Sequence, residues 1–462
     1  MDSANDSRGR RVRSSDGPVA FPMPQTARDL AVDRLLRVEE DGAHVARLSR
    51  EGVSPDVARA VSDYVAGVTR HRRWLDHVLS QFYRGDLDGL QPELLQILRI
   101  GAYDLVVKET ASHAAVNEAV ETAKARLHRG AGGLTNGVLR ALARALSRGP
   151  LAPPATGDRA DDLAVRHSQP TWLVRRWLAA WGDDDTVAFL REMNAPPRYS
   201  LRLTGGQGAR PEALARLAAL GADPSPSEAL DDFVTVRRLQ PVIRDGWLER
   251  GEAAVQDEAA GLVVRVLDPQ PGERVLDAAA APGGKAIYAA LRMENAGTVT
   301  ALDVSESKTR LVEAAAQRQG ATVVEAVAGD LAEWEAGGLY DRVLLDAPCS
   351  GTGVLAKRAD LRWNRQPEDL GALTALQDRL LDAAAGHVRP GGVLVYSTCS
   401  VETEENDDRV EAFLTRHPDF VLDPVSPRVP DAFRDGDVYR ALPHLHGTDG
   451  AFAVRLRRSH TL

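Results

Sequence analysis

The sequence predicts a multidomain protein with three folded parts: an all-α bundle, a small α+β lobe and a doubly wound, Rossmann-like α/β domain. Helical periodicity without a convincing strand fills residues 25–148, and short strands mixed with helices fill residues 164–250. From residue 251 to 462, short apolar runs alternate with helical stretches, which is the pattern of a parallel sheet. Residues 1–24 are predicted to be a disordered tail, and residues 149–163 a linker.

The composition bounds the class of protein. The chain has 462 residues, enough for each part to bury its own core, and its 44% hydrophobic and 27% charged residues are ordinary for a globular protein. No apolar run approaches the roughly 18 residues that a membrane span needs, and the amino terminus lacks a signal-peptide core. With two cysteines in the whole chain, a reducing cytoplasm is expected, with no membrane and no metal as partners.

The charge is unevenly distributed. The formal net charge is -9, yet residues 1–150 carry 22 Lys and Arg against 19 Asp and Glu, so the excess acid lies in the remainder. A nucleic-acid surface must therefore be a local patch. The run Arg70-His71-Arg72-Arg73 is suited to phosphates, although such a run is often only a solvated helix face.

Five helices are predicted in the amino-terminal part. Ala27, Leu30 and Leu35 begin an apolar face with helical spacing, and Ser54 followed by Pro55 is typical of a helix start. The helical segments cover residues 27–38, 57–68, 94–105, 114–127 and 134–146. Short connections between them indicate a compact bundle.

Three segments of this bundle carry a resemblance to the NusB family of RNA-binding helical domains. They are Leu-Arg-Ile-Gly-Ala-Tyr-Asp-Leu from Leu98, His-Ala-Ala-Val-Asn-Glu-Ala-Val from His113, and Thr-Asn-Gly-Val-Leu-Arg from Thr135. The resemblance implies an RNA-binding role, and a helical oligomerisation module is the alternative.

The middle part is predicted to be a small α+β unit. Helices are expected over 171–181 and 184–193, then a break at Asn194-Ala-Pro-Pro197, a strand over 199–203, and further elements over 211–220, 233–236 and 248–251. The break and the later Val255-Gln-Asp-Glu-Ala259 make this unit similar to the RNA-recognition-like lobe that precedes many RNA cytosine methyltransferases.

In the last part, chemistry-bearing residues follow the ends of the predicted strands. Ligands of a doubly wound sheet lie beyond the carboxyl ends of its strands. The first run ends in Asp277-Ala-Ala-Ala-Ala-Pro-Gly-Gly-Lys285, the second in Asp303, the third in Asp330, the fourth in Asp346 and Cys349, and a later one in Cys399. Glycines before a helix let backbone approach a ligand, and an acid about 20 residues later typically accepts from ribose hydroxyls. No dinucleotide or triphosphate-binding glycine motif is present.

The two cysteines are predicted to be chemical rather than structural. A free cysteine is most often a small buried hydrophobe. Here Pro348 places Cys349 on a loop after its strand, and Ser, Thr and Gly flank both cysteines. A cysteine thiolate is a nucleophile, and its surroundings must favour the anion because a model thiol has a pKa of about 8.5.

Together these motifs resemble the S-adenosylmethionine-dependent RNA (cytosine-5)-methyltransferases. With the NusB-like bundle, the chain from about residue 26 to 456 is similar to the RsmB/Sun family, which methylates a cytosine of 16S ribosomal RNA. The closing segment His446-Gly-Thr-Asp-Gly-Ala-Phe452 also fits, with Ala451 where the family has Phe, and Ala279 stands where the family often has Cys.

The resemblance implies a role for each site residue. Cys399 is the expected nucleophile, Cys349 acts in product release, and Asp346 contacts the cytosine ring. Lys285 contacts the target base, and Lys357 and Arg358 reach RNA phosphates. The cofactor residues are expected to be Ala279, Ala280, Ala281, Pro282, Gly283, Gly284, Lys285, Asp303, Asp330 and Asp346.

Other functions stay open at this point. A transfer-RNA cytosine methyltransferase uses the same two cysteine motifs, and a non-catalytic RNA-binding or antitermination factor could retain the fold. A DNA cytosine methyltransferase would use the cysteine of its Pro-Cys motif as nucleophile and carry a large recognition domain. A monomer is expected, and the modified nucleotide does not follow from the sequence.

Overall fold

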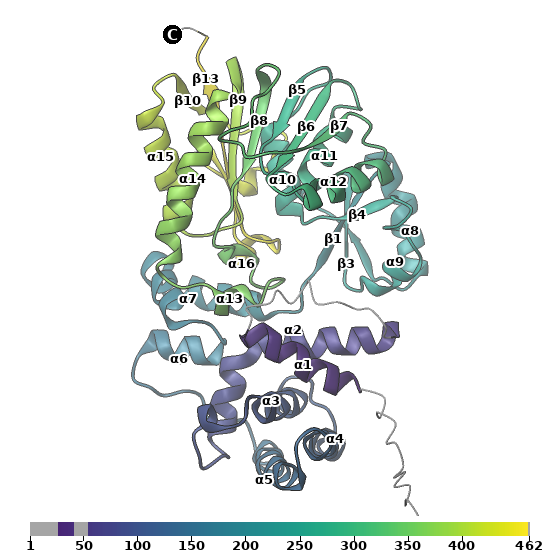
Figure 1. The fold of residues 1–462 in the computed structure, drawn as a ribbon, viewed down its shortest axis with the longest axis vertical. Coiled ribbons are helices and arrows are strands. Elements are labelled where there is room, and N and C mark those ends of the chain that lie inside the picture. The colour runs from purple at the N-terminus through teal and green to yellow at the C-terminus, as the bar shows by residue number, and fades with distance from the viewer. Residues whose placement is uncertain (1–25, 41–53, 461–462) are drawn as a thin grey trace, which may run out of the picture.

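A computed structural model of the chain describes residues 26–40 and 54–460. The predicted tail of residues 1–24 lies outside the described residues. The predicted fold class is confirmed: a helical bundle lies at one end of the long axis, a large sheet flanked by helices at the other, and a small lobe beside the sheet (Figure 1). Within the described ranges, no helix is long and apolar enough to cross a bilayer.

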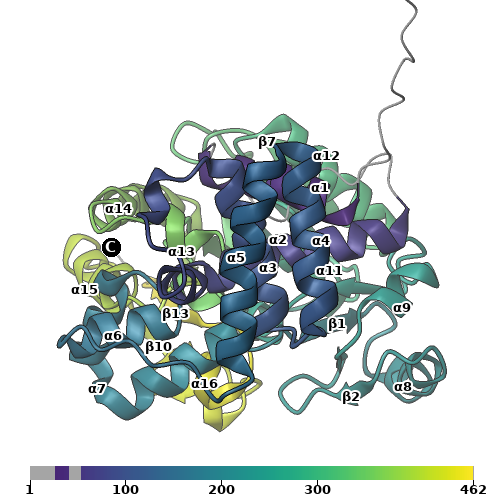
Figure 2. The same cartoon turned by 90° about the horizontal axis from the view of Figure 1, so that it is seen from below.

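All five predicted helices form the bundle: α1 (Ala27–Glu40), α2 (Pro55–Ser80), α3 (Pro92–Val106), α4 (Ser112–Arg126) and α5 (Arg129–Leu146). Ser54 caps α2 as predicted, since its hydroxyl accepts from the Val57 N–H at 3.4 Å. Helices α3 and α5 approach closely because Gly101 has no side chain; a Cβ there would lie 2.4 Å from Leu139. Seen from below, α3, α4 and α5 lie side by side (Figure 2).

Two helices, α6 (Arg159–Arg166) and α7 (Thr171–Asn194), connect the bundle to the rest. Helix α6 begins inside the range predicted to be a linker because Asp158 caps it, accepting from the Ala160 N–H at 2.9 Å. Helix α7 contains Gly182 with φ of 77°, which lies between the two helices predicted over 171–181 and 184–193. The apolar faces of α6 and α7 pack against Leu355 and Leu361 of the α/β domain.

The lobe is a four-stranded antiparallel sheet with order β2-β3-β1-β4 and two helices. The predicted element at 248–251 is a turn, and the strand follows at 253–255 instead. Gly251 causes this, because its φ is 71° and a Cβ there would lie 1.9 Å from the Arg318 carbonyl oxygen. The elements are β1 (Tyr199–Leu203), α8 (Arg210–Ala219), β2 (Pro224–Pro226), β3 (Phe233–Val236), α9 (Gln240–Arg244) and β4 (Ala253–Val255).

The α/β domain is built on a nine-stranded sheet with order β11-β12-β13-β9-β8-β5-β6-β7, and β10 pairs with β13. Strands β9, β8, β5, β6 and β7 are parallel, and β13 is antiparallel to β9. The strands are β5 (Arg274–Asp277), β6 (Thr298–Asp303), β7 (Val324–Ala328), β8 (Tyr340–Asp346), β9 (Val388–Thr398), β10 (Phe420–Asp423), β11 (Arg434–Asp435), β12 (Val438–Ala441) and β13 (Ala451–Arg458). The helices are α10 (Glu258–Leu267), α11 (Gly284–Arg292), α12 (Glu306–Arg318), α13 (Leu361–Asn364), α14 (Asp369–Gly386), α15 (Asp407–Arg416) and α16 (Pro443–His446).

Each central strand contributes to two cores, one on each face of the sheet. Val275, Leu344 and Val395 face one core with α10 and α11, and their neighbours Leu276 and Leu345 face the other with α14 and α15. Alternate side chains of a strand point to opposite faces, so both faces must be covered for such continuous apolar runs to be buried. Helices lie on both faces of the sheet (Figure 1), so ligands are expected at the strand ends.

Candidate active site

The ends of β5, β6, β8 and β9 bring most of the predicted site residues to one edge of the sheet. The strands are parallel neighbours, so their carboxyl ends meet there. The register pairs Asp346 with Ser397, two residues before Cys399. The sheet order therefore explains why motifs about 120 residues apart in sequence form one site.

The two cysteines lie in contact. Their Sγ atoms are 3.1 Å apart, both thiols are free and partly buried, and the Cys399 N–H donates to the Cys349 Sγ at 3.3 Å. The loop after Cys349 is tied to the other cysteine, since the Gly353 N–H donates to the Cys399 carbonyl at 3.0 Å. Gly353 is required there, because a Cβ would lie 2.8 Å from Gly450.

The surroundings of Cys349 favour its protonated form. Its hydrogen bond with Cys399, burial, and the negative charges of Cys399 and Glu405 raise the pKa of the Cys349 thiol well above its usual value. Only one of two thiols in contact ionises readily, because a second negative charge at this distance is strongly disfavoured. A cation beside such a pair favours ionisation of one of its thiols.

Lys285 supplies that cation. Its ammonium lies 2.6 Å from an Asp346 oxygen, and the Ser397 hydroxyl donates to the other oxygen at 2.8 Å. Burial alone lowers the pKa of Lys285, but the charges of Asp346, Asp277 and Cys399 outweigh it and raise the pKa. The lysine therefore remains a cation, paired with the Asp346 carboxylate.

Asp277 is a buried carboxyl at the end of β5. Its side chain is 2% exposed, and neither oxygen has a hydrogen-bond partner among the described residues. Burial, followed by the charge of Asp346, raises the pKa of Asp277 to about 7, although Lys285 and the amides of Ala279 and Ala286 oppose the shift. A buried acid without a partner is a candidate to meet a ligand cation or donor.

The predicted cofactor segment forms the turn between β5 and α11. Gly283 has φ of 98°, and a Cβ there would lie 3.0 Å from Val312. Ala280 donates to the Leu302 carbonyl at 2.8 Å, and Ala281 donates to Asp303 at 3.3 Å, so the turn packs against the end of β6. Its remaining members are Ala279, Pro282, Gly284 and Lys285. Asp330 stands exposed after β7 and accepts from the Ala332 N–H at 3.0 Å.

The two cations predicted to reach RNA are both engaged within the protein. The Lys357 ammonium lies 3.0 Å from Asp449 and 2.5 Å from Asp257, and Arg358 forms an ion pair with Asp360 at 3.1 Å. Lys357 is therefore neutralised by two carboxylates. Neither side chain belongs to the group formed by the cysteines, Lys285 and Asp346.

The basic run 70–73 lies at the junction of the bundle with the catalytic domain. Arg70 donates to the Ala356 carbonyl at 2.8 Å, Arg72 covers the ring of Trp363 at 4.2 Å, and Arg73 pairs with Asp161. The arginines of this run therefore make contacts within the protein, and they do not form a free phosphate-binding face.

Two arginines that the sequence did not single out organise the same junction. Arg362 has no exposed surface and donates to five oxygens: the carbonyls of Arg70, Ser168, Met193 and Leu355, and the Asn194 amide. Arg365 donates to the carbonyls of Cys349 and Ser350, each at 3.1 Å. The segment after Cys349 therefore contacts both the helical bundle and the catalytic loop.

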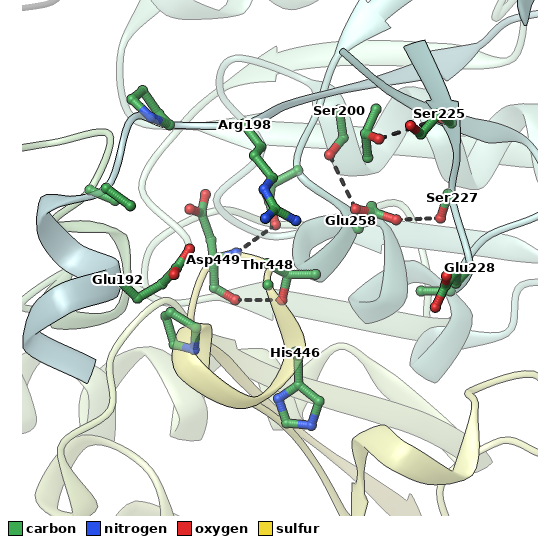
Figure 3. Close-up of a pocket in the computed structure, with 18 of the residues that line it drawn as sticks. Glu192, Arg198, Ser200, Ser225, Ser227, Glu228, Glu258, His446, Thr448 and Asp449 are labelled. Atoms are coloured by element: carbon green, nitrogen blue, oxygen red, sulfur yellow. Dashed lines mark hydrogen bonds between the residues drawn. The ribbon is translucent and has the colours of Figure 1, made fainter. Parts of the chain in front are cut away.

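A pocket of about 550 Å³ lies between the lobe, the end of α7 and the segment before β13 (Figure 3). Arg198, Glu258 and Asp449 line it, and Glu258 accepts hydrogen bonds from Ser200 at 3.4 Å and from Ser227. Of the predicted site residues only Lys357 reaches this pocket. Among the residues the structure describes, no three His, Cys, Asp or Glu side chains gather as a metal site.

The parallel sheet, its glycine turn and the polar strand ends define the last part of the chain as a Rossmann-like methyltransferase domain. The families that match are 16S rRNA methyltransferase RsmB/F over residues 264–457, NusB over 25–144, and the RsmF/B-like ferredoxin-like domain over 169–243. The chain belongs to the ribosomal RNA small subunit methyltransferase B family. The predicted resemblance, including the NusB-like bundle, is confirmed.

Individual relatives agree over nearly the whole length. The "Probable ribosomal RNA small subunit methyltransferase B" of Bacillus subtilis is 34% identical over 94% of this chain and 99% of its own. The ribosomal RNA small subunit methyltransferase B of Klebsiella pneumoniae is 32% identical over 93% of this chain and 97% of its own. A methyltransferase homolog protein from Pyrococcus horikoshii has a crystal structure that matches with a TM-score of 0.56 and 28% identity, over 67% of this chain and all of that one.

Proposed function

We propose that this protein transfers a methyl group from S-adenosylmethionine to carbon 5 of a cytosine in 16S ribosomal RNA, through a covalent adduct between Cys399 and the base. The observation that carries the proposal is the contact between two free thiols, 3.1 Å apart, beside the Lys285–Asp346 ion pair. The names of the relatives supply the substrate class. The bundle at 25–148 and the lobe at 164–250 are proposed to bind the RNA.

The residues at the strand ends fit S-adenosylmethionine. Asp277 presents two buried oxygens without a partner, suited to the ammonium of an amino acid. The turn from Ala279 to Lys285 brings backbone close, and Asp303 and Asp330 follow the next two strands, where carboxylates accept from ribose hydroxyls or an adenine amine. When bound, the cofactor supplies an electrophilic methyl group on a sulfonium.

Cys399 is proposed to activate the base. Carbon 5 of cytosine is a weak nucleophile, but addition of the Cys399 thiolate to carbon 6 converts the ring to an enamine whose carbon 5 can accept the methyl group. Lys285 favours the thiolate, because the charges of Lys285 and Cys399 interact attractively. Asp346, at the end of β8, is proposed to accept from the exocyclic amine and so to orient the ring for attack.

Cys349 is proposed to act in product release. After methylation, carbon 5 carries both a proton and the new methyl group. A base, either Cys349 or a group acting through it, removes that proton; the electron pair restores the double bond between carbons 5 and 6, and the bond from carbon 6 to Cys399 breaks. The contact between the sulfur atoms, 3.1 Å apart, supports this assignment, because a base at Cys349 would lie near the bond from carbon 6 to Cys399.

Lys357 and Arg358 are proposed to contact RNA phosphates once RNA arrives. Both lie in the segment after Cys349, and both carry acidic partners in the protein alone. Phosphates would have to displace those carboxylates, so this contact is expected to depend strongly on salt.

The proposal is tested by methyl transfer. Purified protein with S-adenosylmethionine labelled in the methyl group should label unmodified 16S RNA, and Cys399→Ser should abolish the label while retaining cofactor binding. Bisulfite sequencing would locate the modified cytosine. Transfer to transfer RNA but not to 16S RNA would replace the proposed substrate, and RNA binding without any transfer would leave only a binding factor.

A further inference from the structure

A fully buried carboxylate stands behind the two cysteine loops. Glu405, which ends the short helix Thr403–Glu405, has no exposed surface. It accepts hydrogen bonds from the Ser350 N–H at 2.8 Å, from the Ser350 hydroxyl, and from the Gln377 amide at 3.0 Å. Ser350 directly follows Cys349, so Glu405 contacts one cysteine loop through both the backbone and the side chain.

The same network reaches the loop of the other cysteine through hydroxyl groups. Ser400 follows Cys399 and lies 3.0 Å from the Ser350 hydroxyl and 3.2 Å from the Thr352 hydroxyl. Ser350 and Ser400 are each only 1% exposed. The residue after each cysteine therefore belongs to one buried network that Glu405 anchors on the Cys349 side.

Glu405 lacks a cationic partner. All its side-chain partners are neutral, and no Lys, Arg or His in the described ranges forms an ion pair with it. A buried carboxylate normally requires a cation or several hydrogen bonds, and a charge in a low-dielectric interior acts over several ångströms. Three donated hydrogen bonds stabilise the carboxylate, while its negative field reaches the neighbouring thiol of Cys349.

The two thiols thus face opposite charges. Lys285 lies on the side of Cys399: burial lowers the pKa of Lys285, but the charges of Asp346, Asp277 and Cys399 outweigh burial and raise it. Glu405 lies on the side of Cys349 and contributes to the raised pKa of that thiol, after the contact with Cys399 and burial. The charges around the two thiols therefore differ, even though the two sulfur atoms are in contact.

We infer that Glu405 is a positioning residue that holds the Cys349 loop through Ser350 and, by its uncompensated buried charge, keeps Cys349 protonated while Cys399 ionises. The inference rests on the thiol roles proposed above. It goes beyond them by naming the group that decides which of two touching thiols becomes the nucleophile. Without this charge, the difference between the two thiols would be smaller, because Lys285 alone would supply a charge that distinguishes them.

Other charged or titratable groups also face Cys349 and must be held constant. The carbonyl of Cys349 accepts from the Arg365 guanidinium at 3.1 Å, and the buried Tyr396 hydroxyl donates to the Glu405 carbonyl at 2.6 Å. Among the described residues these groups are Tyr396 from β9, Cys399 just after it, Asp346 from β8, Lys285 from α11, Arg365 after α13, and Glu405 itself.

The test measures thiolate formation directly and needs neither cofactor nor RNA. In the Cys399→Ser background, alkylation of Cys349 by iodoacetamide is followed by peptide mass spectrometry between pH 6 and 10. Glu405→Gln keeps the shape and the ability to accept from the Ser350 N–H but removes the charge. It is expected to lower the pH midpoint for Cys349 by about one unit or more, because a like charge within several ångströms shifts a pKa by that order. In the full protein, the same change should lower the midpoint of Cys349 more than that of Cys399.

Glu404→Gln is the matched control, since Glu404 lies one residue away and pairs with Arg176 at the surface. In this control the pH midpoint for alkylation of Cys349 should equal that of the parent. Ser350→Ala serves if Glu405→Gln reduces folding, because it removes the hydroxyl contact and should slow methyl transfer without a comparable midpoint shift. An unchanged Cys349 midpoint in folded Glu405→Gln overturns the inference, as does an equal shift at both cysteines. Absence of methyl transfer in the unaltered protein would count against the proposed function alone.

Discussion

The Sγ atoms of Cys349 and Cys399 lie 3.1 Å apart although 50 positions separate the two residues in the sequence. Strands β8 and β9 are adjacent and parallel, so the loops after them open at the same place. Two thiols in one pocket titrate as a pair, and the first proton lost defines the nucleophile. The division of roles between them follows from their surroundings, which can be altered one group at a time.

Cys349→Ala is expected to trap the covalent intermediate. Cys399 would still add to carbon 6 and the methyl group would still be transferred, but removal of the carbon 5 proton would be slowed, so the bond to RNA persists. A protein–RNA band should accumulate on a denaturing gel with unmodified 16S RNA and S-adenosylmethionine. Cys399→Ala should give no such band; if it does, the roles of the two thiols must be exchanged.

Lys285→Met is expected to reduce transfer by removing the cation that faces Cys399. The change leaves Asp346 and Asp277 as neighbouring acids without their shared ammonium. Loss of a preorganised charge at a reacting group typically costs about 100-fold in rate. Single-turnover methyl transfer measures the effect, and the pH for half-maximal rate should rise because the thiolate forms less readily. Lys124→Met, which removes an exposed lysine of the bundle paired with Glu121, should leave both values unchanged.

Asp277→Asn should stabilise the fold at alkaline pH while weakening the cofactor site. Burial and Asp346 raise the pKa of Asp277 to about 7 from a usual value of 3.8, so its ionised form is disfavoured in the folded state. Folding therefore loses stability as pH rises from about 4 to 7, by a total on the order of 4 kcal/mol. The melting temperature of the variant should exceed that of the parent at pH 8 and approach it at pH 5.

The same variant separates stability from binding. Calorimetry should show weaker binding of S-adenosylmethionine to Asp277→Asn, because the amide cannot balance a ligand ammonium. In the unaltered protein, affinity should rise between pH 6 and 8, with release of a proton on binding. Affinity independent of pH would mean that Asp277 does not meet the ligand cation.

The sequence predicted the elements and motifs well because these depend on local patterns. Ser54 followed by Pro55 marks a helix start, and the acids after β5, β6 and β8 are visible as polar residues that end apolar runs. Motif order together with the parallel sheet then predicted that Asp346, Cys349 and Cys399 would share an edge. These are properties of a segment or of a recurring sheet topology.

Partners that come from distant segments were not predictable in the same way. Glu405 has no local sequence pattern that marks it, and its contact with Ser350 depends on how two loops fold back. The run 70–73 was considered for phosphates, yet Arg70 contacts a carbonyl 286 positions away. The sequence does not show whether a charged side chain will contact water, RNA or buried backbone.

Arg362→Met should uncouple the helical bundle from the catalytic loop. The guanidinium has no exposed surface and satisfies five oxygens from α2, α7 and the segments beside them. Its removal leaves buried acceptors unpaired, and loss of a charged hydrogen-bond donor in such a site costs about 3–5 kcal/mol. Because these oxygens belong to the junction, the loss is expected to separate melting of the helical bundle from melting of the catalytic domain in differential scanning calorimetry.

In Arg362→Met, affinity for S-adenosylmethionine should change little, since the strand ends are not involved. Transfer to 16S RNA should fall, because the RNA-binding parts no longer hold a fixed position relative to Cys349. Arg175→Met, which removes an exposed arginine paired with Asp158, should preserve a single transition and full transfer. A single transition in folded Arg362→Met with transfer equal to that of the parent would show that the junction does not depend on this side chain.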